Sequence, residues 1–366
     1  MWRIVPVLFV IHGLIHLMGV AKAFGLAELP QLTRPISREM GLLWLVAAAL
    51  MLTSGALFAL WPRYWWITGA VALVVSQLVI VSAWRDAWAG TIVNAVLLLV
   101  VAHGCLTQGP WSFRAEFDRD VARRAATLPA TPTITEHDLA PLPEAVQRYL
   151  RATGVVGQPR VHSYRLRFRG RIRSAPDTAW MPFDADQHSF TAAPARLFLM
   201  RARMFGLPVE AWHRLADGHA IMKVTVAGLV PMVNASGEVM DRSEAVTLFN
   251  DMCLLAPGTL IDRNIRWEPV DAHTVRAHFT HYAQTISAML FFDAEGLLTN
   301  FVSDDRSRAS ADGTSFTRLR FSTPVRGYRQ YGPVRLPQYG EARYHFPEGE
   351  FTYGEFDLQE VSYNVR

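Results

Sequence analysis

Three histidines in the apolar first third of the chain could hold a metal ion or a haem. His12 and His16 are four residues apart, so they share one face of a helix, and His103 lies in a later apolar stretch. Bundles build such sites from facing helices, but no second helix supplies a matching histidine pair at that depth. Hydrogen bonding between helices is the simpler interpretation, and we predict no metal site and no cofactor. The bonded network would consist of His16, Asn94, Gln77 and Ser76.

The second half of the chain contains two further groups of ionisable residues. His278 and His281 resemble a ligand pair, but their odd separation on a strand would place the rings on opposite faces. Asp184 and Asp186 share a face without a histidine at fixed spacing. The sequence has no G-x-S-x-G, H-E-x-x-H or glycine-rich phosphate motif. We therefore predict no catalytic residues and expect a binding protein rather than an enzyme.

Charge and cysteine content exclude two other classes of protein. The formal net charge is +4, and it comes almost entirely from arginines spread along the chain rather than clustered. Such a distribution argues against nucleic acid as a partner. The two cysteines, Cys105 and Cys253, lie in an apolar stretch and in a predicted helix, so a disulfide framework or zinc site is not expected.

Methionine and aromatic side chains are the most promising material for a binding site. They gather in the sequence on either side of one predicted helix, and such side chains suit adaptable apolar pockets. A plain hydrophobic core is the alternative interpretation. The predicted ligand-binding residues are Trp180, Phe183, Phe198, Met200, Trp212, Met222, Leu248, Phe249, Met252 and Phe291.

The first third of the chain is predicted to cross a membrane four times. The apolar spans are Ile4–Val20, Met40–Trp61, Trp65–Trp84 and Trp88–Leu106. Each is close to the ~20 residues that cross the hydrocarbon layer, and tryptophans lie mostly near the span ends. We expect a multi-pass protein of the cell (inner) membrane, with the lipid bilayer as a partner. The distribution of arginine and lysine favours a cytoplasmic C-terminal domain.

The spans and the pattern that follows divide the chain into three parts. Residues 1–108 form the transmembrane domain, 109–140 an amphipathic helix able to lie on lipid headgroups followed by a Pro/Thr-rich linker, and 141–366 a β domain. From Val161 the apolar residues alternate strictly with arginines, which is typical of a strand with one buried face. The arginine row would either attract anionic lipids or pair with acids on neighbouring strands.

One amphipathic helix interrupts the strands. Asp241 is a candidate N-cap, Leu248, Phe249 and Met252 lie on one face, and Pro257 ends the pattern. A helix between two strand-rich halves must bury its apolar face against the sheet. The predicted fold is therefore a membrane α plus α+β protein. A four-helix transmembrane bundle precedes a large curved antiparallel sheet, resembling a half-barrel, with this helix on its concave side.

Two stretches carry a resemblance to a known family. HGLIHLMGVAKAFGLAELPQLTRPIS from His12 and GLVPMVNASGEVMDRSEAVTLFNDMCLLAPGTL from Gly228 resemble a bacterial membrane-associated family known only as a domain of unknown function. The resemblance extends over nearly the whole chain and assigns no catalytic residue. The β domain, with FFDAEGLLTNF from Phe291 and a final Tyr363-Asn364, is also similar in pattern to the half-barrel of bacterial lipoprotein carriers.

The resemblance implies a curved sheet around an apolar cavity. We therefore expect a membrane-anchored protein whose β domain binds a hydrophobic small molecule, a lipid or an acyl chain. One alternative is an enzyme that acts on a lipid-like substrate. Another is a membrane redox or structural protein that uses His12, His16 and His103.

Overall fold

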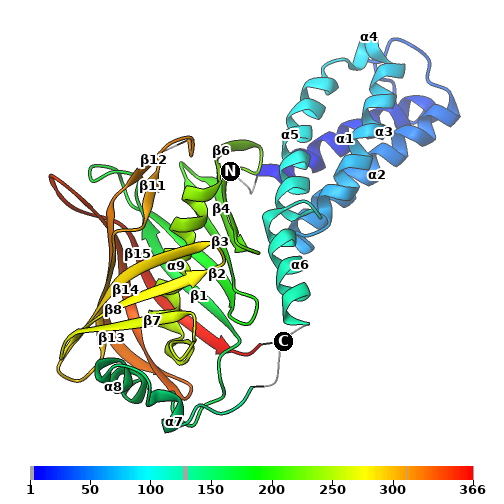
Figure 1. Ribbon diagram of the computed structural model, residues 1–366. Helices are drawn as coiled ribbons and strands as arrows, with labels where there is room; N and C mark the ends of the chain where they lie inside the picture. The colour runs from blue at the N-terminus through cyan, green and yellow to red at the C-terminus, as the bar shows by residue number, and fades with distance from the viewer. Residues whose placement is uncertain (1–3, 127–130, 311, 366) are drawn as a thin grey trace. The chain divides into compact units, whose positions relative to one another are not determined.

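Two compact units make up the chain (Figure 1). The computed structural model describes residues 4–126, 131–310 and 312–365. The boundary between the units falls after Glu116, and the short segment Ala227–Leu229 groups with the first unit. The division into 1–108, 109–140 and 141–366 stays a prediction.

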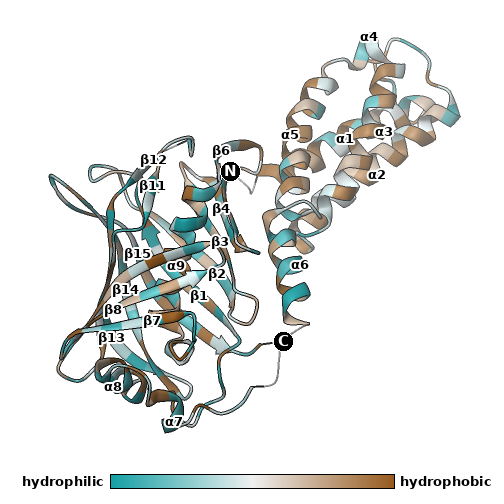
Figure 2. Cartoon of the chain, viewed as in Figure 1, coloured by the Kyte–Doolittle hydropathy of each residue, from teal (hydrophilic) through white to brown (hydrophobic). Residues whose placement is uncertain are grey.

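The first unit is helical and apolar. Its helices are α1 (Ile4–Phe24), α2 (Arg38–Leu60), α3 (Trp65–Ser82), the short α4 (Trp84–Ala87) and α5 (Gly90–Gln108). The helical stretches that begin at Ile4, Arg38, Trp65 and Gly90 are each long and apolar enough to cross a membrane. In Figure 2 these helices are coloured largely towards the hydrophobic end of the scale. The prediction of four apolar helices at the N-terminus is confirmed.

Close packing of α1 on α2 depends on small residues. A Cβ atom added at Gly19 would collide with the ring of Trp44, and one added at Gly13 would lie 3.1 Å from Met51. Glycines at such crossings let helix backbones approach closely, which is a principal source of stability between helices in lipid. Ser37 caps the start of α2 by accepting a hydrogen bond from the Met40 N–H.

The second unit is built on a 13-stranded antiparallel sheet (Figure 1). Its first half is β1 (Ser163–Ile172), β2 (Met181–Phe190), β3 (Ala195–Met204), β4 (Leu207–Ala216), β5 (His219–Val226) and β6 (Val230–Ser236). Its second half is β7 (Ile265–Asp271), β8 (Thr274–His281), β9 (Gln284–Phe292), β10 (Leu298–Ser303), β13 (Arg320–Tyr331), β14 (Val334–Phe346) and β15 (Gly349–Tyr363). Pairing of β1 with β15 joins the halves. A separate hairpin consists of β11 (Ser307–Ala309) and β12 (Phe316–Arg318).

A single helix, α9 (Glu238–Leu255), lies on the concave side of this sheet, as predicted (Figure 1). Its residues from Met240 to Leu255 are buried except for Arg242. The helix begins three residues before the predicted N-cap Asp241, after Gly237 at φ 97°. The Asp241 carboxylate instead accepts the backbone N–H of Ala220 on β5.

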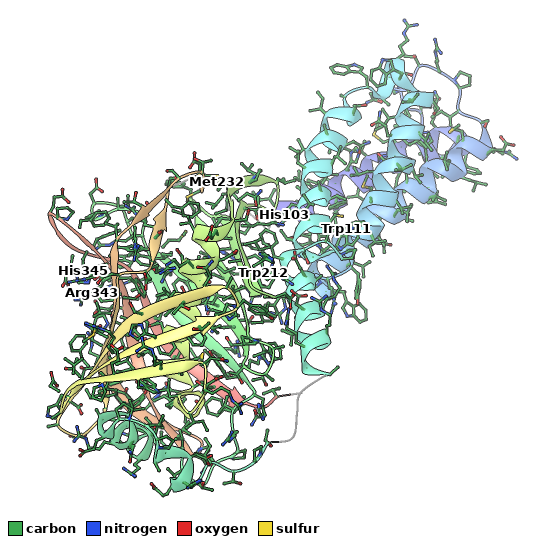
Figure 3. The ribbon with its side chains drawn as sticks, viewed as in Figure 1. His103, Trp111, Trp212, Met232, Arg343 and His345 are labelled. Atoms are coloured by element: carbon green, nitrogen blue, oxygen red, sulfur yellow. The ribbon has the colours of Figure 1, made fainter. Side chains whose placement is uncertain are left out.

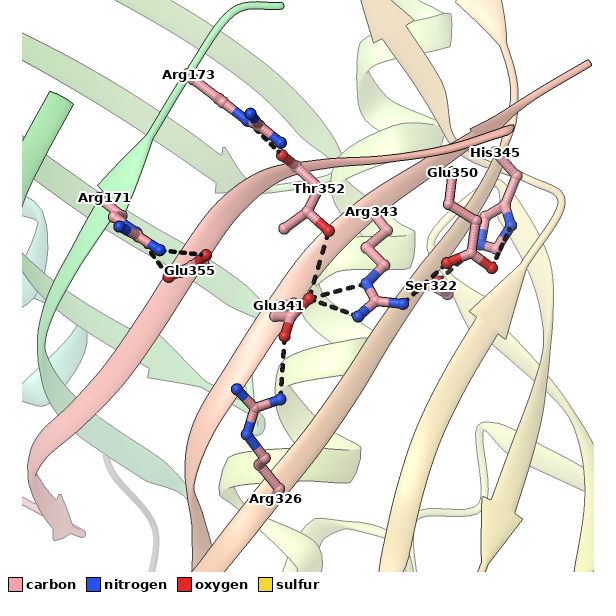
Figure 4. A network of polar contacts seen from close by, with 10 residues as sticks. All are labelled: Arg171, Arg173, Ser322, Arg326, Glu341, Arg343, His345, Glu350, Thr352 and Glu355. Carbon is pink, nitrogen blue, oxygen red and sulfur yellow. Dashed lines mark hydrogen bonds and ion pairs between the residues drawn. The ribbon is translucent and has the colours of Figure 1, made fainter. Parts of the chain in front are cut away.

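The arginine row of β1 lies on the outer face of the sheet and is ion-paired. The pairs are Arg167 with Glu360, Arg169 with Asp184, and Arg171 with Glu355. Figure 4 shows the network continuing across β14 and β13, where Glu341 accepts hydrogen bonds from Arg326 and Arg343. Pairing with acids on neighbouring strands, one of the two predicted roles of this row, is what the structure shows.

Three short helices flank the sheet. They are α6 (Phe113–Ala125), α7 (Glu136–Leu139) and α8 (Glu144–Ala152). From Phe117 on, α6 belongs to the second unit, where Phe117 meets Trp212 edge-on at 5.9 Å and Asp120 accepts from Arg214 at 2.6 Å. This face of α6 therefore packs on the outer face of β4 rather than on lipid headgroups.

Candidate ligand-binding site

The concave face of the sheet is where a ligand was expected, and there α9 fills the space. Phe249 has no exposed surface; it stacks on Phe279 at 5.0 Å and meets Phe301 edge-on at 5.8 Å. Leu248 and Met252 are also buried. The predicted apolar face of this helix therefore forms a packed core with β8 and β10.

Strand alternation decides which other predicted residues share this core. Gln187 and Arg196 bond to side chains of α9, so they identify the concave face of β2 and β3. Residues at even separations from them lie on the same face. From the register of the paired strands, the predicted residues on the concave side are Phe183, Phe198, Met200, Met222, Leu248, Phe249 and Met252.

The remaining predicted residues lie elsewhere. Trp212, labelled in Figure 3, pairs with Leu199, which is next to Phe198 on β3 and therefore points to the outer face. On that face Phe117 covers Trp212. Phe291 directly follows the buried Leu290 on β9, so its side chain points to the opposite face of the sheet. Trp180 lies before β2 between two arginines, with the Arg171 and Arg173 guanidinium carbons 4.6 and 4.4 Å from its ring centroid.

A buried ionic cluster on the concave side was not predicted. Arg196 donates to Asp251 at 2.6 Å and to Glu244 at 3.2 Å, and all three side chains are at most 10% exposed. Gln187 also donates to Asp251, at 2.8 Å, and a ring nitrogen of His213 lies 3.3 Å from Glu244. These bonds fasten one face of α9 to β2, β3 and β4.

The carboxylates of Glu244 and Asp251 both accept hydrogen bonds from the permanently charged guanidinium of Arg196. We therefore interpret the cluster as structural. Burial alone would raise the pKa of Glu244, but the hydrogen bond with His213 and the charge of Arg196 outweigh it and lower the pKa to about 2. The sequence contained a signal, because Glu244 and Asp251 are seven residues apart and share a helix face. Nothing local indicated that Arg196 would meet them.

Two tyrosines satisfy the carbonyl groups at the C-terminal end of α9. Tyr149 donates to the Cys253 carbonyl at 2.8 Å, and Tyr363 donates to the Leu255 carbonyl at 2.6 Å. The last carbonyls of a helix have no partner within it, so such donors are needed when the end is buried. Burial raises the pKa of both phenols, which keeps them protonated as donors.

Beyond this end of α9 lies a pocket of about 380 Å³. It is formed by the segments around Ile134 and Val155–Val161, by Gly258, by the β13–β14 turn and by the end of β15. Its apolar lining includes Ile134, Val155, Val161, Val334 and Val361. Among the lining residues that the structure describes there is no histidine, carboxylate, cysteine, lysine or arginine.

Backbone pairing holds the wall of this pocket in place. The Ile134 N–H donates to the Gln158 carbonyl at 2.8 Å, and the Gly157 N–H donates back to the Ile134 carbonyl at 2.8 Å. Asn364 accepts the His162 N–H at 2.8 Å through its side chain, which pins the end of β15 beside this wall. The pocket is therefore a preformed feature of the fold, although none of the predicted ligand residues lines it.

The histidines of the helical unit take part in hydrogen bonds. His12 Nε2 lies 3.0 Å from Asn94 Oδ1 and 3.3 Å from Ser76 Oγ, and Asn94 donates to Gln77 at 3.0 Å. His16 Nδ1 lies 2.8 Å from the His12 carbonyl, so it bonds within its own helix rather than across to another. In the described residues, no group of three His, Cys, Asp or Glu side chains could hold a metal ion.

Comparison with known proteins gives a family and distant likenesses to solved structures. A profile of a family of unknown function (DUF6544) matches residues 132–356, which confirms the resemblance to a domain of unknown function for this part of the chain; the stretch from His12 lies outside the match. No curated protein matches the chain at a significant level.

Two of the solved structures that resemble this chain are bacterial domains. One is described as an outer membrane lipoprotein-sorting protein domain from Vibrio parahaemolyticus; it is 9% identical, with 55% of this chain and 85% of that chain covered at TM-score 0.33. The other is a DUF1329 family protein from Desulfovibrio piger, 11% identical, with 64% and 95% covered at TM-score 0.35. The first is of the kind whose half-barrel the sequence pattern resembles. At these TM-scores neither likeness carries weight for ligand or activity.

Proposed function

The chain belongs to DUF6544, a family of unknown function, and we propose that its β domain binds a hydrophobic ligand in the pocket at the C-terminal end of α9. The observation that carries this proposal is the pocket itself. Its volume of about 380 Å³ falls within the range of small-molecule sites, which are commonly apolar and occur at the mouths of β-barrels.

An acyl chain is the ligand that fits this lining best. Valine, isoleucine and proline side chains offer apolar contact, and the described lining has no acid–base pair that would support catalysis. Four apolar helices also suit the bilayer, where acyl chains are the abundant apolar groups. In this proposal the predicted residues on the concave face, such as Phe249, pack α9 and support the pocket from behind.

Photo-crosslinking tests the proposal directly. The full chain in nanodiscs would be incubated with a fatty acid that carries a diazirine, irradiated, digested and mapped by mass spectrometry. We expect label on peptides that contain Val155–Val161 and Val334, and we expect Val161→Phe to reduce it several-fold by filling the pocket. The matched control is Val302→Phe, which adds the same bulk to β10, away from the pocket lining.

Two results would contradict the proposal. Label spread evenly over the β domain would show that the pocket does not select the ligand. Equal labelling of the Val161→Phe and Val302→Phe proteins would show that the ligand lies elsewhere.

We also propose that the β domain lies on the cytoplasmic side of the inner membrane. The positive charges expected on the side of the domain are Arg3, Arg63, Arg114, Arg119, Arg123 and Arg124. Those expected on the opposite side are Lys22, Arg34, Arg38 and Arg85. The excess on the first side supports a cytoplasmic domain, because positively charged loops tend to stay inside.

Reporter fusions test this topology. A reporter active only in the cytoplasm should be active at the C-terminus and inactive when inserted at Gly25, in the loop between α1 and α2. A reporter active only outside the cytoplasm should give the reverse pattern. Activity of the same reporter at both positions would rule out four crossings, and the reversed pattern would place the domain outside.

A further inference from the structure

Two neighbouring hairpins of the β domain end in exposed hydrophobic side chains. At the β3–β4 turn Phe205 is 98% exposed and Met204 is 36% exposed. In the β5–β6 hairpin, Val230 is 53% exposed and Met232 is 45% exposed, and Figure 3 marks Met232 on β6. We call Met204, Phe205, Val230 and Met232 the apolar tips.

The apolar tips lie at one end of the first half of the sheet. Strands β3 to β6 are consecutive neighbours and antiparallel, so the β3–β4 and β5–β6 turns fall at the same end. The β4–β5 turn falls at the opposite end, and there the turn residues are Asp217 and Gly218. The β3–β4 and β4–β5 turns therefore differ in polarity, since the first carries Phe205 where the second carries Asp217.

The backbone geometry of the β3–β4 turn does not require a phenylalanine at position 205. Phe205 has φ 51° and Gly206 has φ 79°, which corresponds to a tight turn with both central residues in the left-handed region. Asp217 and Gly218 adopt nearly the same values, 57° and 82°. Asn or Asp is favoured at the first position, whereas a bulky residue there is strained. Strain retained at an exposed aromatic residue points to a role in contact with something outside the domain.

We propose that the apolar tips insert into the surface of a lipid bilayer. The same chain has four helices that are long and apolar enough to cross a membrane. If they anchor the chain there, a lipid surface is always close to the β domain. Aromatic and aliphatic side chains enter the boundary between headgroups and acyl chains, and nearby basic residues add attraction to anionic lipids. Arg203, exposed beside Met204, supplies such a charge. The proposal does not depend on the ligand pocket.

The test places a fluorophore on each kind of turn. Phe205→Cys and, separately, Asp217→Cys would be introduced with Cys105→Ser and labelled with a polarity-sensitive dye in the full chain, reconstituted at one chain per nanodisc. Phe205 and Asp217 are both exposed turn residues, so neither change removes core packing. Cys253 is buried and should not react. Lipids that carry a quencher at the headgroup boundary report contact with the bilayer.

We expect blue-shifted emission at position 205 and quenching several times stronger there than at 217. Met232→Cys should behave like position 205, and anionic lipid should strengthen its quenching. Equal quenching at 205 and 217, or none at either, would overturn the proposal. A blue shift at 205 without lipid quenching would also overturn it, because it would mean that protein rather than lipid covers this turn.

Discussion

Replacing Phe249 by alanine is expected to lower the free energy of unfolding of the β domain by about 3–5 kcal/mol, the usual cost of deleting a buried aromatic ring. The ring has no exposed surface and is held between Phe279 and Phe301. Backbone pairing fixes the strands that carry the neighbouring side chains, so these side chains can relax only partly into the space left behind. Denaturant unfolding of the full chain in detergent, followed by proteolysis of the unfolded β domain, measures the loss.

The matched control is Phe205→Ala, which removes the same ring from an exposed turn. It should change stability by no more than about 0.5 kcal/mol, because the ring is exposed and alanine keeps the same left-handed backbone conformation. A loss below about 1 kcal/mol for Phe249→Ala would contradict a packed core, because a buried phenylalanine normally costs more. It would mean that the space around α9 adapts readily, and the concave face would then return as a candidate binding site.

Local periodicity accounts for the parts of the fold that the sequence predicted well. Apolar spans of the right length identify the four helices, and alternation in β1 identifies its buried face, because both signals are set by neighbours along the chain. Leu248, Phe249 and Met252 were placed correctly for the same reason. The stripe did not reveal that Glu244 and Asp251, on the other face of α9, are buried as well, because that face packs through ion pairs rather than through apolar contacts.

Where both faces of a strand are buried, the alternation of apolar and polar residues no longer predicts which face is the concave one. Trp212 and Leu199 point to the outer face yet are buried, in part because Phe117 of α6 covers Trp212. The apolar character of Trp212 in β4 therefore did not predict which face of the sheet it occupies. The same ambiguity grouped Trp212 with Phe198, which lies on the concave side of the neighbouring strand.

Contacts between distant segments explain why the pocket and the ionic cluster were missed. Ile134, Gly258 and Val334 meet at the pocket although more than a hundred residues separate the first from the others. Arg196 on β3 reaches Asp251 only after the three strands β4, β5 and β6 and the helix α9 have been placed. No spacing rule encodes such meetings, because they depend on sheet register and on where α9 enters the concave side.

Replacing Arg196 by methionine is expected to destabilise the β domain by about 3–5 kcal/mol near neutral pH. The guanidinium is the cation that Glu244 and Asp251 share, and its removal leaves two buried carboxylates without that partner. Methionine keeps much of the apolar bulk, so the loss reports charge rather than volume. Adding Glu244→Gln and Asp251→Asn to Arg196→Met removes the uncompensated charges and should recover a large part of the stability.

The pH dependence separates this electrostatic cause from a packing defect. In the folded protein the pKa of Glu244 is about 2, below its ordinary value of 4.5. A lowered pKa contributes stability that is fully present above the unfolded value and is lost as pH falls from about 4.5 towards 2. Without Arg196 the pKa of Glu244 rises from its wild-type value, because burial favours the neutral acid and the charge of Arg196 no longer opposes it, although His213 still does. Protonation therefore relieves the variant at a pH where it does not yet weaken the wild type. The stability difference between the two proteins should therefore shrink on acidification from neutral pH to about 3. A difference that stays constant over this range would assign the loss to packing and remove the charge-based account of the cluster.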